Sequence, residues 1–159
     1  MQVPPLHILF NERSCASHLD VEHMDTNIPL DEAYIILVED EPSARLVALE
    51  LLRNAGAGYC YARKTADSAV LLAKNIKHVH LFLVDINMPV KSGFDFLKEV
   101  RSDEKLREAR IVAVSAGTLA QDIEQARESG FDGFISKPLH PMRFAKQVQA
   151  VLDGESVWE

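Results

Sequence analysis

Short runs of apolar residues recur along the chain, and each is ended by polar residues or a proline. The runs lie at 34–38, 81–84, 111–114 and, shorter, at 133–136, and residues 59–62 are a further candidate. Four or five apolar residues in succession are typical of strands that are covered on both faces of a parallel sheet. The pattern therefore predicts five strands.

The segments between these runs carry apolar residues at helical spacing. They predict helices at about 45–54, with Pro42 in the first turn, at 94–101, at 119–129 and at 142–152. A further helix passes through 69–73 and is capped by Thr65 or Asp67. The charged stretch 101–110 is interpreted as a solvated turn. Strand and helix alternate five times, which predicts an α/β fold with a parallel sheet.

Polar residues follow four of the predicted strands at the point where each strand ends. Glu39 and Asp40 follow the first, Asp85 ends the run at 81–84, Ser115 follows the run at 111–114, and Lys137 follows the last. The carboxyl ends of parallel strands meet at one edge of a sheet, where ligands bind in open α/β folds. We therefore expect three acids, one hydroxyl and one ammonium in a single pocket.

These residues resemble the receiver domain of two-component response regulators, of the stand-alone type. The resemblance covers about 34–152, and the separations of 45, 30 and 22 positions between the motifs also match. It implies a flavodoxin-like, doubly wound, five-stranded parallel sheet of order 2-1-3-4-5 with five helices. The matching residues are the acidic pair Glu39 and Asp40, then Asp85 with Met88, Pro89 and Gly93, then Ser115, and finally Lys137 with Pro138.

Three neighbouring carboxylates repel one another unless a cation joins them, and an all-oxygen site favours a hard divalent ion such as Mg²⁺. The resemblance implies that Asp40, Asp85 and the backbone carbonyl of Asn87 contact the metal, while Glu39 acts through a water molecule. Glu39 departs from the family pattern, which has Asp there, and is longer by one methylene.

The resemblance also implies a chemistry for the site. Asp85 would act as the nucleophile toward phosphorus and become an acyl phosphate, while Lys137 neutralises charge on the phosphoryl oxygens. The donor would be a phosphohistidine on a sensor histidine kinase or a histidine phosphotransfer protein, or a small acyl phosphate. Ser115 would bind a phosphoryl oxygen, and Phe134 occupies the switch-aromatic position. Two alternatives stay open: Phe134 as an ordinary core aromatic residue, and Lys137 as a solvated loop lysine.

Charge and periodicity divide the chain of 159 residues. Residues 1–33 hold six acids and one base, a net charge of -5 out of -7, and lack sustained periodicity. We expect a flexible acidic extension at 1–33, a receiver domain at 34–153 and a tail at 154–159 in which Trp158 is frayed and incidental. Met24 is a second possible start. The Lys137–Pro138 bond resembles the family's cis peptide.

The distribution of charge and apolar residues also bears on partners. The chain has no basic stripe, which disfavours nucleic acid, and no apolar run approaching the roughly 20 residues that span a bilayer. The sequence therefore predicts a cytoplasmic protein without a membrane partner.

Three function classes compete. The first is a receiver, not an enzyme, that signals through phosphorylation-dependent binding to a downstream protein or serves as an intermediate of a multistep phosphorelay. About seven residues follow the last predicted helix, too few for an output domain. The second is an aspartyl-phosphate phosphatase resembling the haloacid dehalogenases, which place a second Asp where Asn87 stands. The third, a flavin or nucleotide binder, lacks a glycine-rich loop after the first strand.

Overall fold

The computed structural model describes residues 27–117 and 119–159. Their strands and helices alternate, as the sequence predicted. In chain order they are β1 (Tyr34–Val38), α1 (Pro42–Asn54), β2 (Tyr59–Arg63), α2 (Ala66–Asn75), β3 (Leu81–Asp85), α3 (Gly93–Ser102), β4 (Arg110–Ser115), α4 (Ala120–Ser129), β5 (Gly133–Ser136) and α5 (Pro141–Leu152).

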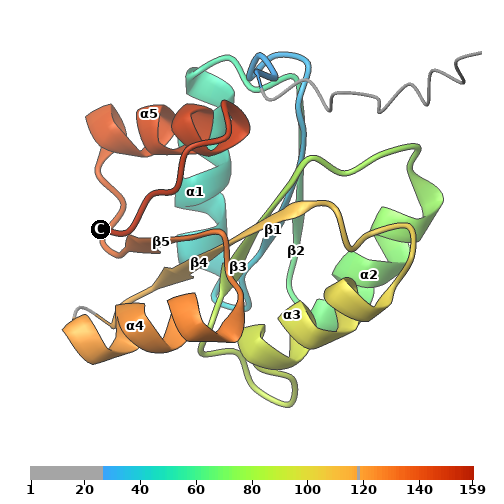
Figure 1. The fold of residues 1–159 in the computed structure, drawn as a ribbon. Coiled ribbons are helices and arrows are strands. Elements are labelled where there is room, and N and C mark those ends of the chain that lie inside the picture. The colour runs from blue at the N-terminus through green and yellow to red at the C-terminus, as the bar shows by residue number, and fades with distance from the viewer. Residues whose placement is uncertain (1–26, 118) are drawn as a thin grey trace, which may run out of the picture.

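All five strands lie in one parallel sheet of order β2-β1-β3-β4-β5, which confirms the predicted doubly wound topology. The register aligns Val38 of β1 with Val84 of β3, and Asp85 with Val114 of β4. Consequently, Glu39, which follows β1, and Ser115, which ends β4, lie at the level of the end of β3. Figure 1 shows the sheet between its helices, with α1 and α5 on one face and α2, α3 and α4 on the other.

Alternate residues of each strand pack against opposite helical layers, because successive side chains of a strand point to opposite faces of the sheet. One layer joins Ile36, Phe82, Ile111 and Phe134 to apolar residues of α2, α3 and α4. The other joins Leu37, Leu83, Val112 and Ile135 to apolar residues of α1 and α5. The central strand β3 is buried along its whole length. This two-sided burial explains why its sequence is a continuous apolar run.

Side-chain caps begin the first three helices. The carboxylate of Glu41 accepts hydrogen bonds from the backbone N–H groups of Ser43 and Ala44, and α1 begins at Pro42, which lies in the first turn as predicted. Thr65 caps α2, as one of the two predicted alternatives proposed. Ser92 and Asp95 cap each other at the start of α3 in a capping box.

The charged stretch 101–110 is more ordered than the predicted solvated turn. Leu106 and Ala109 are buried in the core, so the prediction was wrong for these residues. The guanidinium of Arg101 donates to the carbonyls of Arg107 and Ala109, both at 2.7 Å, and pairs with Asp132. The seven charged side chains of this stretch concealed the two apolar positions that pack into the core.

Residues outside the strands and helices are also held at both ends of the described chain. The backbone N–H of Leu30, within the expected extension, donates to the Gln149 side chain at 3.1 Å, and Gln149 donates to the Ile28 carbonyl. At the other end, Trp158 is half-buried and forms a parallel bridge with Phe134 of β5. The expectation that Trp158 is frayed was therefore wrong.

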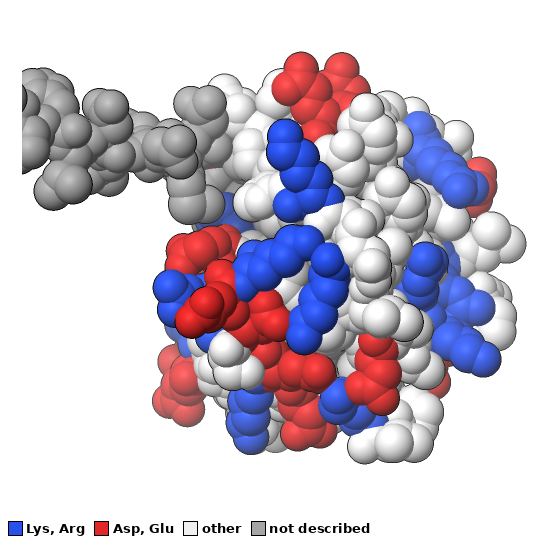
Figure 2. All heavy atoms as spheres, turned by 90° about the vertical axis from the view of Figure 1, so that its right-hand side faces the viewer, with Lys and Arg blue, Asp and Glu red and all other residues white. Residues whose placement is uncertain are grey.

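Within the described residues, no helix is long and apolar enough to cross a membrane. On the face turned to the viewer in Figure 2, Lys and Arg side chains lie next to Asp and Glu side chains. Ion pairs such as Lys91 with Asp67 and Glu99, and Lys74 with Asp103, show the same interspersion. Exposed pairs of this kind add little stability, but they leave a surface of mixed sign.

Candidate functional site

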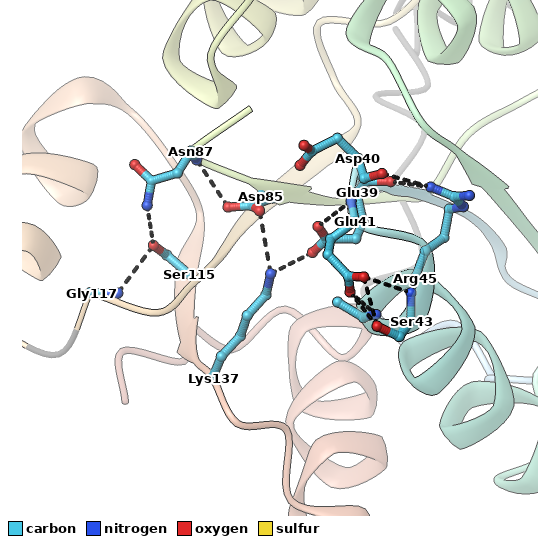
Figure 3. Close-up of polar contacts among 11 residues, drawn as sticks. Glu39, Asp40, Glu41, Ser43, Arg45, Asp85, Asn87, Ser115, Gly117 and Lys137 are labelled. Carbon is cyan, nitrogen blue, oxygen red and sulfur yellow. Dashed lines mark hydrogen bonds and ion pairs between the residues drawn. The ribbon is translucent and has the colours of Figure 1, made fainter. Parts of the chain in front are cut away.

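The acidic residues predicted to gather at one edge of the sheet do so. Glu39, Asp40 and Asp85 each offer a carboxylate oxygen, and these atoms lie within 4.8 Å of one another. Glu39 and Asp85 are only 3% and 7% exposed. The register of β1 with β3 accounts for their proximity, since Glu39 follows Val38 just as Asp85 follows the aligned Val84. Figure 3 shows them in the same pocket as Lys137 and Ser115.

Lys137 places its ammonium between two of these carboxylates. Its Nζ pairs with Glu39 in a short contact and lies 3.3 Å from Oδ2 of Asp85. The backbone supports this position: the N–H of Lys137 donates to the Ser115 carbonyl at 2.8 Å, and the following bond to Pro138 is cis, as the resemblance implied. Lys137 is thus part of the pocket and not a solvated loop residue.

The hydroxyl of Ser115 is oriented by two donors. Its Oγ accepts from Nδ2 of Asn87 at 3.3 Å and from the backbone N–H of Gly117 at 3.2 Å. A hydroxyl has two lone pairs and one proton. With both lone pairs engaged, no acceptor for the O–H of Ser115 occurs among residues 27–117 and 119–159. The resemblance did not imply this contact of the Asn87 side chain.

The loop after β3 holds Asp85 through its own backbone. The N–H of Asn87 donates to Oδ1 of Asp85 at 2.9 Å, and the N–H of Gly93 donates to the Ile86 carbonyl at 3.0 Å. A Cβ on Gly93 would lie 2.7 Å from the Asp85 carbonyl oxygen and 2.8 Å from Cα of Ile86. Gly93 therefore permits α3 to begin directly against the end of β3.

A second set of contacts fixes the acidic pair. The guanidinium of Arg45 donates to the backbone carbonyls of Glu39 at 2.9 Å and Asp40 at 3.2 Å. The N–H of Glu41 donates to Oε1 of Glu39 at 3.1 Å. Sequence reasoning missed these roles of Glu41 and Arg45, although the position of Glu41 just before Pro42 is a recognisable helix-cap signal.

The electrostatics of the pocket follow from burial and from the ion pair. Burial raises the pKa of Glu39, and its hydrogen bond with Lys137 opposes this shift. Burial also disfavours the charged form of Lys137, but its hydrogen bond with Glu39 and the charge of Asp85 outweigh burial and raise its pKa. Lys137 is therefore a cation at neutral pH, and it compensates part of the negative charge of the pocket.

Phe134 lies at the position that the resemblance assigns to the switch aromatic residue. It is three residues before Lys137 on β5, and its side chain is fully buried in the layer formed with α2, α3 and α4. This burial is also what an ordinary core aromatic residue shows, so both alternatives persist. A cavity of about 270 Å³ lies beside Ser115 on the α4 side, lined also by Phe94 and Asp122.

A five-stranded doubly wound sheet with three acids, a serine and a lysine at its carboxyl edge defines the class of receiver-like α/β signalling domains. Comparison with known proteins agrees: the model of the response regulator receiver domain family matches residues 35–149. The chain therefore belongs to the response regulator receiver family. Receiver domains are signalling modules that bind Mg²⁺ at an acidic pocket.

Individual relatives are similar along nearly their whole length. The polar-differentiation response regulator DivK of Brucella ovis is 29% identical over 118 residues, which cover 74% of this chain and 94% of DivK. The two-component response regulator ORR3 of Oryza sativa subsp. indica is 29% identical over 128 residues, 79% of this chain and 95% of ORR3. Among solved structures, the chemotaxis response regulator CheY4 of Vibrio cholerae has 26% identity and a TM-score of 0.68, with 75% of this chain and 98% of CheY4 covered.

Proposed function

We propose that Asp85 is the phosphoacceptor of a response regulator that receives a phosphoryl group from a histidine kinase or a histidine phosphotransfer protein. The observation that carries this proposal is the position of Asp85 at the end of β3, where the Lys137 ammonium contacts its carboxylate and Asn87 contacts both Asp85 and the hydroxyl of Ser115. Its backbone contact from Asn87 engages Oδ1, and Oδ2 faces the ammonium. Asp85 is thus a fixed carboxylate beside a cation.

The donor set fits Mg²⁺, because three carboxylates with converging oxygens and no soft ligand favour a hard cation. Asp40, Asp85 and the backbone carbonyl of Asn87 would hold the ion directly, with Glu39 acting through water. When bound, the ion supplies positive charge that lowers the repulsion between the carboxylates and an anionic phosphodonor.

Phosphoryl transfer itself is assigned to Asp85, Lys137 and Ser115. An oxygen of Asp85 attacks phosphorus as the bond to the donor nitrogen breaks, and the acyl phosphate stays on Asp85. Lys137 already lies within 3.3 Å of that carboxylate and neutralises charge on the transferred group. The hydroxyl of Ser115 then donates to a phosphoryl oxygen. Asn87 offers no carboxyl group to activate water, which argues against a phosphatase.

The phosphodonor protein is proposed to dock beside α1. A cavity of about 440 Å³ adjoins Glu39 and Lys137, and its remaining lining is mainly apolar, including Ala44, Val47 and Leu139. Val47 is 51% exposed although it is apolar. Docking here would bring a phosphohistidine next to Asp85. Val47→Asp should therefore lower phosphotransfer from the cognate kinase while labelling by acetyl phosphate stays unchanged; an equal loss of both would contradict this docking surface.

The function itself is tested with acetyl phosphate and the variant Asp85→Asn. The amide keeps the shape of the carboxyl group but is not a nucleophile, so phosphoryl incorporation should fall to background. Ser115→Ala is the matched control, because it removes a hydroxyl from the same pocket and leaves the nucleophile. Incorporation measured by intact mass should persist in Ser115→Ala. Labelling of Asp85→Asn at the wild-type level would refute the assignment.

A further inference from the structure

The outer edge of β5 is paired with residues 157–159, which we call the C-terminal strand. The N–H of Phe134 donates to the Val157 carbonyl at 2.6 Å, the N–H of Glu159 donates to the Phe134 carbonyl at 3.0 Å, and the N–H of Ser136 donates to the Glu159 carbonyl at 2.8 Å. The pairing is parallel and sets Trp158 opposite Phe134. It satisfies backbone groups that an edge strand otherwise leaves open.

Two side chains of the C-terminal strand are bound by the helices on either side of β5. Trp158 packs against the core layer below it, and the guanidinium carbon of Arg127 on α4 lies 4.6 Å from its ring centroid. Glu159 pairs with Arg143 of α5 and accepts from Nε2 of Gln147 at 3.1 Å. In Figure 1 the C-terminal end lies beside β5, with α5 above it and α4 below it.

The first residue of β5 leaves room for this pairing. A Cβ on Gly133 would lie 2.8 Å from the Val157 carbonyl oxygen, which is closer than side-chain carbons approach an oxygen. The glycine therefore admits a parallel strand at the edge of β5. A single methyl group at this position would prevent a strand from pairing with β5.

The connection to the C-terminal strand leaves the end of α5 over the surface, where the N–H groups of Gly154 and Glu155 donate to the carbonyls of Val151 at 3.1 Å and Ala150 at 2.9 Å. Gly154, Glu155 and Ser156 are exposed, and Gly154 has a φ of 94°. The strand itself is short, and three backbone hydrogen bonds join it to β5. A segment held by few bonds at the end of an exposed connection opens at a lower free energy than the core does.

We propose that β5, α4 and α5 form a groove for an extended protein segment in which an aromatic residue is followed by an acid, and that the C-terminal strand is its resident ligand. A partner protein with such a segment would add to β5 as a parallel strand. Its aromatic ring would stack under Arg127, and its carboxylate would meet Arg143. The resident strand competes as a tethered ligand of high effective concentration, so it sets the affinity that a partner must exceed.

A peptide with the sequence of residues 153–159 tests this groove. Trp158 is the single tryptophan of the chain, so the full-length variant Trp158→Ala has a weakened resident strand and no tryptophan of its own. The peptide's indole should shift its emission to shorter wavelength on binding, with saturation. Labelled peptide should bind the wild-type chain at least about tenfold more weakly, because the intact strand competes.

Matched variants locate the binding. Adding Gly133→Ala to Trp158→Ala should abolish peptide binding, whereas Arg143→Gln should weaken it about twofold to fivefold, as expected for loss of an exposed ion pair. Labelling of each variant by acetyl phosphate and its circular dichroism spectrum show that the domain is folded. Absence of saturable binding, or binding that Gly133→Ala leaves intact, would overturn the proposal.

A measurement on the wild-type chain covers the case in which Trp158→Ala does not fold. The same peptide with phenylalanine in place of tryptophan should displace the resident strand and raise the quenching of Trp158 by acrylamide, whereas an alanine peptide should not. Light scattering tests whether a second copy of this chain, and not a partner protein, occupies the groove. A wild-type dimer that dissociates when Trp158 is replaced would assign the groove to a second copy of this chain and overturn the partner proposal.

Discussion

Asn87 and Ser115 are joined by a hydrogen bond of 3.3 Å between the loop after β3 and the end of β4. Together with the bond from Gly117, it occupies the acceptor positions of the Ser115 hydroxyl. The contact gives the Asn87 side chain a positioning task that is separate from the metal-binding task of its backbone carbonyl. A substitution that removes only the side chain distinguishes the two.

We predict that Asn87→Ala still accepts a phosphoryl group from acetyl phosphate, with an initial rate within about threefold of wild type, because every residue supplies a backbone carbonyl. The N–H groups of residues 115–117 should exchange faster with deuterium, since Ser115 loses one of its two donors. Mass spectrometry measures both quantities. A loss of labelling as complete as that of Asp85→Asn would show that the side chain is required for the chemistry.

Lys137 should stabilise the fold by compensating Glu39 and Asp85. Lys137→Met keeps much of the side-chain volume but leaves two mostly buried carboxylates without their cation, so the free energy of unfolding should fall in the absence of Mg²⁺. In a double-mutant cycle with Glu39→Gln, the coupling should be about 1–3 kcal/mol. Urea unfolding of the four proteins gives this value, and a coupling near zero would contradict a stabilising pair.

The sign of the pH dependence follows from the raised pKa of Lys137. A cation whose folded-state pKa is raised contributes stability that is present below its ordinary value of 10.5 and lost as the pH rises through the raised value. The difference between wild type and Lys137→Met should therefore be present at pH 7 to 9 and decrease only above pH 10.5.

The site was predictable from the sequence to the extent that the sheet determines it. Parallel strands bring their carboxyl ends to one edge, so Glu39, Asp40 and Asp85 had to meet once five strands alternated with helices. Continuous apolar runs such as β3 could be assigned to strands from the sequence, because both faces of these strands are buried. The right-handed crossover rule left only a few possible strand orders, and the resemblance to receiver domains indicated the order 2-1-3-4-5 among them.

Contacts made by single side chains across the fold were not predictable. Nothing in the local pattern indicates that the amide of Asn87 reaches Ser115, 28 positions away, because side-chain orientation depends on the packed loop. The C-terminal strand was missed for another reason. Three residues are too few to show the alternation that marks a strand, and their pairing depends on space that Gly133 leaves 24 positions earlier.

Phosphorylation should require a divalent cation. Glu39, Asp40 and Asp85 carry more negative charge than Lys137 alone compensates, so the pocket without a metal repels an anionic donor. Excess EDTA should lower the rate of labelling by acetyl phosphate at least tenfold, and added Mg²⁺ should restore it. Mg²⁺ should also raise the melting temperature of wild type more than that of Asp40→Asn. Undiminished labelling in EDTA would refute a metal requirement.

Gly93 should be intolerant of a side chain. A methyl group there meets backbone atoms of Asp85 and Ile86, which cannot move without shifting the end of β3. Gly93→Ala should cost about 1–3 kcal/mol of stability, as overpacking does elsewhere, and should slow labelling. Gly117→Ala is the matched control, since the atoms nearest to its methyl group belong to the Asp122 side chain and not to the backbone, and that side chain can shift at the cost of its hydrogen bond from the N–H of Leu119. Equal effects of the two substitutions would argue against a backbone clash at Gly93.

The last prediction concerns how the modified site reaches the surface. A phosphoryl group on Asp85 would offer new charge-assisted hydrogen bonds to Ser115 and Lys137, which lie at the ends of β4 and β5. The elements attached to these two residues are α4 and the strand that carries Phe134. A ligand shifts such a two-state element only through differential contacts, with a typical coupling of about 1–3 kcal/mol.

Beryllofluoride, a phosphoryl mimic, should therefore change deuterium exchange mainly within residues 115–140. Both outward backbone groups of Phe134 bind the C-terminal strand, so movement of β5 should also alter the fluorescence of Trp158. Asp85→Asn with the same mimic is the control and should show neither change. If exchange changed only around Asp85 and the acidic pair while Trp158 stayed constant, the site would bind a phosphoryl group without a switch, and a phosphorelay intermediate would replace a binding module as the function.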